Sequence, residues 1–174
     1  MRLYVEPAES PTAVDEGLVD ALAALSRSLV GITVRSLGVL DVDLTMSQYR
    51  TLVLLASRGP VRVVDLAVAL QVHPSTVTRT CDRLVRRGLV ARRPGESDRR
   101  VSWLSLTTAG KDIVGAVIQH RTAEIRRLVA TTGVRAGGGL RESVEALVAA
   151  AGEPDERQWR RHWERCAGPP APPT

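Results

Sequence analysis

The apolar residues near the start of the chain recur at steps of three and four, which is the spacing of one helix face. This periodicity predicts a long amphipathic helix over residues 14–36. A second long helix is expected over residues 109–130, and a further amphipathic helix over 140–151, with the glycine-rich run 135–139 between them. The first apolar stripe consists of Leu18, Leu22, Leu25, Leu29 and Ile32.

Shorter elements are expected in the middle of the chain. Thr45 is a favoured N-cap residue, and Gln48 follows at the spacing of a capping box, so a helix is predicted from Thr45 to about Ala56. Residues 61–63 are rich in β-branched side chains, which favours a short strand. A brief helix is then expected over residues 64–70.

Another helix is predicted to begin at Pro74 and to stop at Gly88. Proline is favoured at the first helical position, and glycine is favoured just after the last one. The apolar residues of this helix form one narrow face that includes Cys81. The opposite face is polar and carries Ser75, Thr76, Thr78, Arg79, Arg83 and Arg86.

A β-hairpin is expected directly after this polar helix. Residues 89–92 form the first strand and residues 101–106 return as the second, although their alternation is imperfect. Residues 94–98 have the composition of a turn. The tip of the hairpin is polar and basic, and Thr107 or Thr108 caps the long helix that follows.

This order of elements predicts a mainly α fold with a small β-hairpin wing, a winged helix-turn-helix domain. The short helix over 64–70 and the polar helix after it form the helix-turn-helix. In this geometry the second helix enters the major groove of DNA, where its exposed polar residues contact base edges and phosphates. Aromatic residues make up only 3% of the chain and Phe is absent, which also favours packed helices over a β-sandwich.

The charge of the chain is concentrated near the predicted wing. The formal net charge is +5, and the segment 79–100 alone holds eight arginines against three acidic residues, which is also +5. Arginine suits phosphate and guanine contacts. Two other interpretations stay open: the arginines reflect genomic composition, since Lys111 is the single lysine, or they form a solvated helix face without a nucleic-acid partner.

Several classes of function lack a sequence basis. No GxSxG, Walker-type or HExxH arrangement is present, so an enzyme is not expected. The two cysteines have no metal-ligand spacing, and neither a metal nor a cofactor is expected. The N-terminus lacks a signal-peptide pattern, and no apolar run approaches the length of a membrane span. A cytoplasmic, nucleoid-associated protein without a membrane partner is predicted.

The stretch 44–110 resembles the MarR (multiple antibiotic resistance regulator) family of winged helix-turn-helix transcriptional regulators. With the flanking helices, the resemblance covers about residues 14–151. It rests on three sequence pieces, and the spacing between the second and the third piece is its most specific part. These pieces are Asp65-Leu66-Ala67; Ser75-Thr76-Val77-Thr78-Arg79 with Asp82-Arg83-Leu84 and Gly88-Leu89-Val90; and Asp98-Arg99-Arg100 with Leu106-Thr107-Thr108-Ala109-Gly110.

The resemblance implies a homodimeric repressor whose N- and C-terminal helices form the dimer interface. Two recognition helices would then face the half-sites of a pseudo-palindromic operator, roughly 34 Å apart on double-stranded DNA. By the same resemblance, Arg100 enters the minor groove from the wing tip and Asp98 orients it, with Arg99 beside them. Arg79 and the hydroxyls of Ser75, Thr76 and Thr78 would serve the major groove and nearby phosphates.

The resemblance also implies a small phenolic or carboxylate effector, bound between the dimerisation helices and the winged domain, that releases the DNA. No ligand motif is visible in the sequence. The expected organisation is a flexible arm over 1–12, a regulator over 13–152 and a C-terminal extension with a disordered tail over 153–174. Within the regulator, the DNA-binding part is about 44–107 and the dimerisation helices are about 14–37 and 109–151.

Two alternative functions remain open at this point. A thiol redox sensor would use a reactive cysteine, but Cys81 lies on the apolar face of the polar helix and is interpreted first as a small buried hydrophobe. Cys166 falls in the proline-rich tail, where incidental oxidation is the simpler expectation. A winged-helix protein-interaction module is the second alternative, and the basic hairpin argues against it.

For several individual residues, both a functional and a purely structural role are compatible with the sequence. His73 precedes the polar helix and either contacts a phosphate or is a turn residue without a specific function. Tyr49 packs in the core or lines a ligand pocket, with core packing favoured. Trp103 is expected to pack rather than to stack on bases. Trp159 and Trp163 are four residues apart and are expected to pack on the dimer core or on each other.

Overall fold

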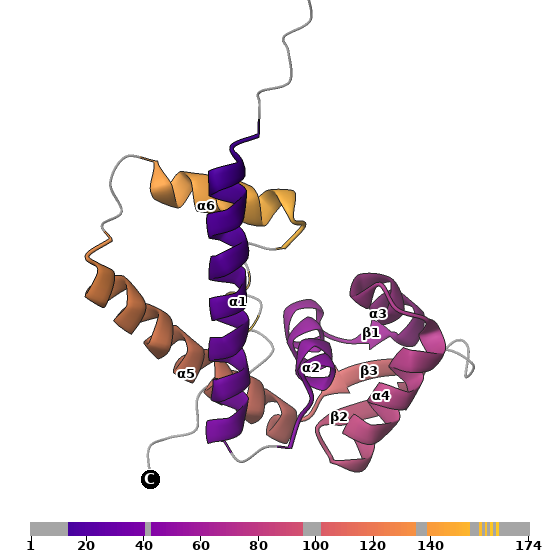
Figure 1. Cartoon of the computed structure of the whole chain (residues 1–174). Coiled ribbons are helices and arrows are strands. Elements are labelled where there is room, and N and C mark those ends of the chain that lie inside the picture. The colour runs from indigo at the N-terminus through magenta and orange to yellow at the C-terminus, as the bar shows by residue number, and fades with distance from the viewer. Residues whose placement is uncertain are drawn as a thin grey trace, which may run out of the picture.

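The computed structural model describes residues 14–40, 43–95, 102–134 and 139–153, together with residues 157, 159, 161 and 163. The predicted mainly α fold with a small β-wing is confirmed, because long helices flank a helical domain with a small sheet (Figure 1). The elements are α1 (Glu16–Val39), α2 (Met46–Arg58), β1 (Val61–Arg62), α3 (Val63–Leu70), α4 (Pro74–Arg86), β2 (Val90–Pro94), β3 (Ser102–Leu106), α5 (Thr108–Thr132) and α6 (Leu140–Ala150).

The local signals for helix ends are confirmed. Thr45 caps α2, and the side chains of Thr45 and Gln48 form both hydrogen bonds of a capping box. Pro74 is the first residue of α4, which ends before Gly88, whose φ of +69° lies in the left-handed region that glycine favours. Of the two candidate caps of α5, Thr107 is the one used, since its side chain accepts from the backbone N–H of Gly110 at 3.1 Å.

The sheet has three strands in the order β1-β3-β2, and both pairings are antiparallel. The short strand β1 joins the hairpin, with Val61 opposite Leu104 on β3. The sequence predicted both the short strand and the hairpin, but it did not predict that they pair. β1 closes one edge of the wing sheet and ties it to α3, which begins at the next residue.

The core lies between α2, α3, α4, the sheet and the first half of α5. It is built from aliphatic side chains, as the scarcity of aromatic residues requires. Tyr49 is 4% exposed and belongs to this core, which supports the packing interpretation. The residues with no exposed surface include Leu52, Leu66, Leu84, Leu104, Val114 and Val117.

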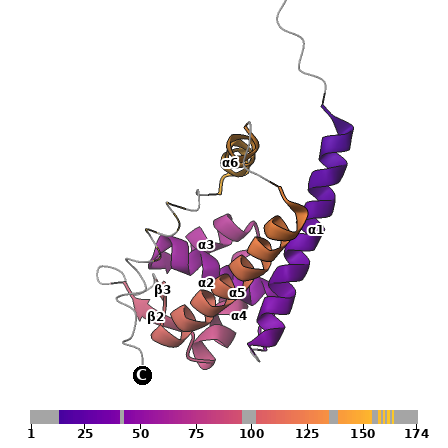
Figure 2. The same ribbon diagram turned by 90° about the vertical axis from the view of Figure 1, so that its left-hand side faces the viewer.

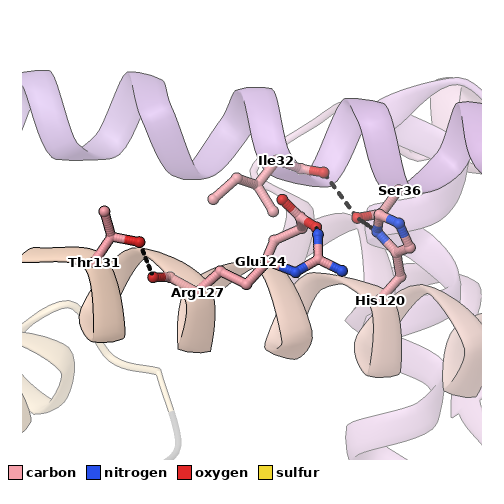
Figure 3. A network of polar contacts seen from close by, with 6 residues as sticks. All are labelled: Ile32, Ser36, His120, Glu124, Arg127 and Thr131. Carbon is pink, nitrogen blue, oxygen red and sulfur yellow. Dashed lines mark hydrogen bonds and ion pairs between the residues drawn. The ribbon is translucent and has the colours of Figure 1, made fainter.

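Helices α1 and α5 pack against each other, and a buried polar contact lies between them (Figures 1 and 2). The hydroxyl of Ser36 on α1 is fully buried, donates to the carbonyl of Ile32 at 2.8 Å and lies 2.9 Å from Nδ1 of His120 on α5. Because that single hydroxyl proton goes to Ile32, Nδ1 of His120 must be the donor to Ser36. Figure 3 shows this bridge beside Glu124 and Arg127, which form an ion pair along α5.

The N-terminal half of α1 and all of α6 leave apolar residues uncovered. Leu18 and Leu25 are about half exposed, whereas Ile32 near the other end of the same stripe is buried. α6 has no buried residue, and a cavity at its C-terminal end lies between it and the helices of the winged domain (Figure 2). Among the described residues, α1 alone has the length and composition that a membrane span requires, although the sequence holds no long uninterrupted apolar run there.

The described part of the C-terminal extension returns to the body of the molecule. The rings of Trp159 and Trp163 stack with their centroids 5.7 Å apart, which confirms the expectation that they pack on each other. They also pack against the core cluster. A Cβ atom added to Gly115 on α5 would lie 3.3 Å from the ring of Trp163, so the indole rests directly on this glycine.

Candidate nucleic-acid interface

The solvent face of α4 gathers polar side chains at the spacing of one helix face. Ser75, Arg79 and Arg86 are exposed, and they follow one another at helical intervals with Asp82 between the two arginines. The opposite face packs Val77, Cys81 and Leu84 into the core. Burial therefore fixes which side of α4 is available to a partner, and that side carries three arginines when the neighbouring exposed Arg83 is included.

The first turn of α4 is organised by His73, whose role the sequence left open. Nδ1 of His73 accepts from the backbone N–H of Ser75 at 3.3 Å and lies 2.8 Å from its hydroxyl. An imidazole nitrogen that accepts carries no proton, so this contact requires Nδ1 to be the unprotonated ring nitrogen. His73 is thus the N-cap of α4, and it holds the Ser75 side chain at the start of the helix.

The two threonines predicted for the interface lie on the flanks of the exposed face. Thr78 is partly buried, and its hydroxyl donates to the carbonyl of Pro74 at 3.0 Å. Its proton is therefore used inside the helix, while its oxygen remains able to accept. Thr76 is exposed beside a cavity of about 200 Å³ between α2 and α4, which Val72 and Thr80 also line.

The C-terminal end of α4 meets the N-terminus of α2 in a basic cleft of about 480 Å³. Arg83 and Arg86 line it as predicted members of the polar face. Arg87 lines it as well, and its guanidinium donates to the backbone carbonyl of Asp43. Arg87 was not among the predicted site residues because it follows the helix, although the Arg86-Arg87 doublet is a visible signal in the sequence. Three guanidinium groups at a helix N-terminus favour a phosphate.

The wing contributes two arginines to the described part of the molecule, both from β2. Arg92 forms an ion pair with Asp82 of α4 at 2.8 Å, and Arg93 lies opposite the partly exposed Trp103. Trp103 is 40% exposed, so it packs only in part. The predicted wing-tip residues Asp98, Arg99 and Arg100 lie outside the described residues.

Cys81 is a core residue of the recognition helix. Its side chain has no exposed surface, and burial raises the pKa of its thiol to about 11, with Arg92 lowering and Asp82 raising that pKa to smaller extents. At neutral pH the thiol is therefore protonated and shielded. Both properties are the opposite of those of a redox-sensing cysteine, which needs an accessible thiolate. Cys166 lies outside the described residues.

Two buried polar atoms between α2 and α5 have no hydrogen-bond partner within the described part of the chain. They are the hydroxyl of Tyr49 and Nε of Arg121. Burial raises the pKa of the tyrosine hydroxyl, and the nearby Arg121 partly offsets this rise. Both groups donate hydrogen bonds, so together they favour an acceptor such as a carboxylate oxygen or a water molecule.

A cavity lies between the winged domain and the end of α6. Its volume is about 930 Å³, and its lining includes Arg50, Leu54, Arg58 and Val68 from the winged domain. Glu153, just after α6, forms an ion pair with Arg50 across it. Within the described residues, no cluster of three His, Cys, Asp or Glu side chains is arranged to hold a metal ion.

Sequence comparisons identify relatives that cover both the winged domain and its surroundings. The profile of the MarR family matches residues 44–102. The HTH-type transcriptional repressor MdtR of Bacillus subtilis is 34% identical over 115 residues, which are 66% of this chain and 73% of that protein. The multiple antibiotic resistance protein MarR of Escherichia coli is 35% identical over 72 residues, 41% of this chain and 50% of that protein.

Solved structures extend the similarity to almost the whole fold. The crystal structure of RV1404 from Mycobacterium tuberculosis is 39% identical with a TM-score of 0.75, and the match covers 86% of this chain and all of that one. Escherichia coli MarR in complex with operator DNA shares the fold at 24% identity, with a TM-score of 0.60 over 78% of this chain and 93% of that one.

The residues matched by the family profile coincide with the winged part of the molecule. The family profile spans the helix-turn-helix and β2, and it ends at the first residue of β3. The relatives are regulators of transcription rather than enzymes, which confirms the expectation from the missing catalytic motifs. The chain belongs to the MarR family of winged helix-turn-helix transcriptional regulators.

Proposed function

We propose that the chain is a homodimeric repressor that binds a pseudo-palindromic operator and is released by a small-molecule ligand. The DNA-binding part of this proposal rests on the exposed face of α4, which carries Arg79, Arg83 and Arg86. The opposite face of the helix is buried in the core. The repressor role is supported by MdtR of Bacillus subtilis, which is described as a transcriptional repressor. Such a protein acts on the chromosome, and we place it in the cytoplasm, at the nucleoid.

Each predicted contact has a proposed target on the DNA. Arg79 and Ser75, near the start of α4, reach base edges in the major groove, and Thr76 and Thr78 support them from the flanks. Arg86 and Arg87 bind backbone phosphates from the basic cleft, together with Arg83. Arg100, oriented by Asp98 and next to Arg99, enters the minor groove and responds to its width.

The dimer is supported by apolar surface that the single chain leaves uncovered. The exposed leucines of α1 and the exposed Val144 and Leu147 of α6 form the faces that a second copy would bury. These helices lie outside the DNA-binding part, which matches the proposed division into dimerisation helices and a winged domain. A two-fold axis through them presents two α4 helices to half-sites roughly 34 Å apart.

The ligand part of the proposal is supported by the cavity of about 930 Å³ between the winged domain and α6. Arg58 and Arg50 offer charge to a carboxylate or a phenolate, and Leu54 and Val68 offer apolar contact to its ring. The unpartnered donors on Tyr49 and Arg121 are a second place for an acidic oxygen. A ligand that binds better to the DNA-free arrangement shifts the population away from the operator complex.

The DNA-binding proposal is tested by selecting preferred duplexes from a random pool and measuring the affinity of the purified protein for them. We expect a two-fold symmetric site and an affinity that falls steeply as salt rises, because each neutralised phosphate releases counterions. Arg79→Ala and Arg100→Ala should each weaken binding to the selected site by roughly tenfold or more. Arg141→Ala on α6 is the control and should leave it unchanged. Full affinity in both test variants would reject the proposed interface.

The ligand proposal needs its own measurement. Benzoate is a suitable probe, and we expect it to weaken binding to the selected duplex and to protect the protein against heat. Arg58→Ala should reduce both effects while leaving DNA affinity without benzoate unchanged. If neither benzoate nor a panel of related phenolic acids alters DNA affinity, the ligand-release part of the proposal falls and the DNA-binding part stands.

A further inference from the structure

The exposed face of α4 contains one acidic side chain. Asp82 lies three residues after Arg79 and four before Arg86, so it shares the face that is proposed to meet DNA. A free carboxylate at this position would repel the phosphates that the neighbouring arginines attract. Its presence inside a basic surface therefore requires an explanation beyond helix formation.

The explanation lies in the base of the wing. Arg92 pairs with Leu104 in the sheet register, and Leu104 is fully buried, so the Arg92 side chain starts from the inner face of the sheet. From there its guanidinium reaches Asp82 at 2.8 Å. Among the described residues this is the one ion pair that joins α4 to the wing sheet.

The pair adds a directional link to the apolar packing between α4 and β2. Leu84 of α4 and Val90 of β2 pack into the same core, but dispersion contacts of this kind allow small rotations of the hairpin. A charge-assisted hydrogen bond has a preferred geometry, so it restricts those rotations. The link sits two residues after the start of β2, close to the point about which the hairpin would pivot.

We propose that Asp82 and Arg92 are positioning residues that lock the wing to the recognition helix and so set the sequence specificity of the protein. The inference rests on the proposed DNA-binding function. α4 and the wing tip read two different grooves, and both can contact one half-site only when their separation is fixed. The pair also neutralises Asp82, so the carboxylate does not oppose the phosphates. Neither residue needs to touch a base for this role.

The test separates positioning from simple charge. Asp82→Asn removes one negative charge, so the variant should bind scrambled duplexes more tightly. The preference of this variant for the selected duplex over a scrambled one should fall about tenfold, which is the size of one lost base contact. Asp65→Asn is the matched control, because Asp65 pairs with Arg62 at 2.7 Å within the winged domain but does not link α4 to the wing. That control should keep its preference.

Two further variants complete the experiment. Arg92→Gln should lose preference like Asp82→Asn, and the exchange Asp82→Arg with Arg92→Asp should recover at least part of it, which a purely structural or charge effect would not produce. Hydroxyl-radical footprints should show that the minor-groove protection next to each half-site weakens in the single variants. Thermal melting checks that all variants stay folded.

The outcomes are distinct from those of the proposed function. If the wild-type protein binds no DNA, both the proposed function and this inference are overturned. If the wild-type protein prefers the selected duplex and Asp82→Asn keeps the same preference as Asp65→Asn, the inference alone is overturned. A lost preference that returns in the exchanged variant supports it.

Discussion

At the scale of single residues, Cys81 illustrates how burial decides chemistry. A cysteine on the helix proposed to read DNA invites a redox interpretation, yet this thiol has no exposed surface and its pKa is raised to about 11. The residue therefore acts as a small apolar side chain that fills the space under α4. Ionisation of this thiol therefore affects the stability of the fold and does not serve as a redox signal.

The raised pKa of Cys81 predicts a pH dependence of folding. The folded protein holds the thiol proton up to about pH 11, whereas the unfolded chain releases it near pH 9.0. Stability from this group is thus fully present below pH 9 and is lost as pH rises toward 11, with a magnitude of roughly 1–3 kcal/mol. Urea unfolding at pH 8 and at pH 10.5 measures it, and Cys81→Ala should show a smaller drop between the two.

Gly110 provides a second prediction, based on space rather than charge. A Cβ atom at this position would lie 2.1 Å from the backbone oxygen of Leu89, so α5 could not keep its approach to the end of α4. Gly110→Ala should destabilise the protein by about 1–3 kcal/mol in chemical unfolding. Gly38→Ala is the control: nothing lies within 4 Å of its added Cβ, so it should stabilise α1 by about 0.5–1 kcal/mol.

The candidate site was predictable from the sequence only where its residues signal locally. The polar face of α4 follows from helical spacing, and the structure exposes Ser75 and Arg79. The partnership of Asp82 with Arg92 was not predictable, because it depends on how the β2 register directs one side chain over the helix. Arg87 was missed for a similar reason, since its cleft exists only after α2 and α4 pack.

At the scale of elements, the joint between α1 and α5 includes a buried polar bridge. The hydroxyl of Ser36 is enclosed and bonded to both Ile32 and His120. Ser36→Ala leaves a donor on the imidazole without its acceptor, and we expect a loss of about 1–2 kcal/mol of stability. Thermal or urea unfolding measures it.

The matched control for this joint lies on the same helix. Ser28 also donates to a carbonyl four residues earlier, that of Ala24, but Ser28 is exposed. Ser28→Ala should therefore change stability by only a few tenths of a kcal/mol. Equal effects of the two substitutions would show that the bridge to His120 contributes nothing to the packing of α1 on α5.

Most elements were predictable because their start and stop signals are short-range. The capping box at Thr45, the proline at the start of α4 and the cap at Thr107 each act within a few residues. The pairing of β1 with β3 was not predicted, since it joins Val61 to Leu104 across the whole helix-turn-helix. Two-residue strands carry too little pattern to specify such a partner.

At the scale of the whole molecule, the uncovered apolar surface predicts assembly. Replacing Leu18 and Leu25 of α1 by Glu places charges in the proposed interface, and we expect the protein to sediment as a monomer and to lose affinity for the two-fold symmetric duplex. Arg27→Glu and Arg35→Glu, on the same helix, test whether added negative charge alone has this effect. A wild-type protein that sediments as a monomer at micromolar concentration would contradict the proposed dimer.

The bare N-terminal half of α1 has a consequence for the behaviour of the protein at low abundance. A helical segment of this length is only marginally stable in water without tertiary contacts, so its order would be coupled to formation of the proposed dimer. The melting temperature should then rise with protein concentration, by mass action. In a cell, a low concentration of the protein would unfold this part of α1 before the winged domain unfolds. The concentration of the protein would then decide whether the DNA-binding dimer forms.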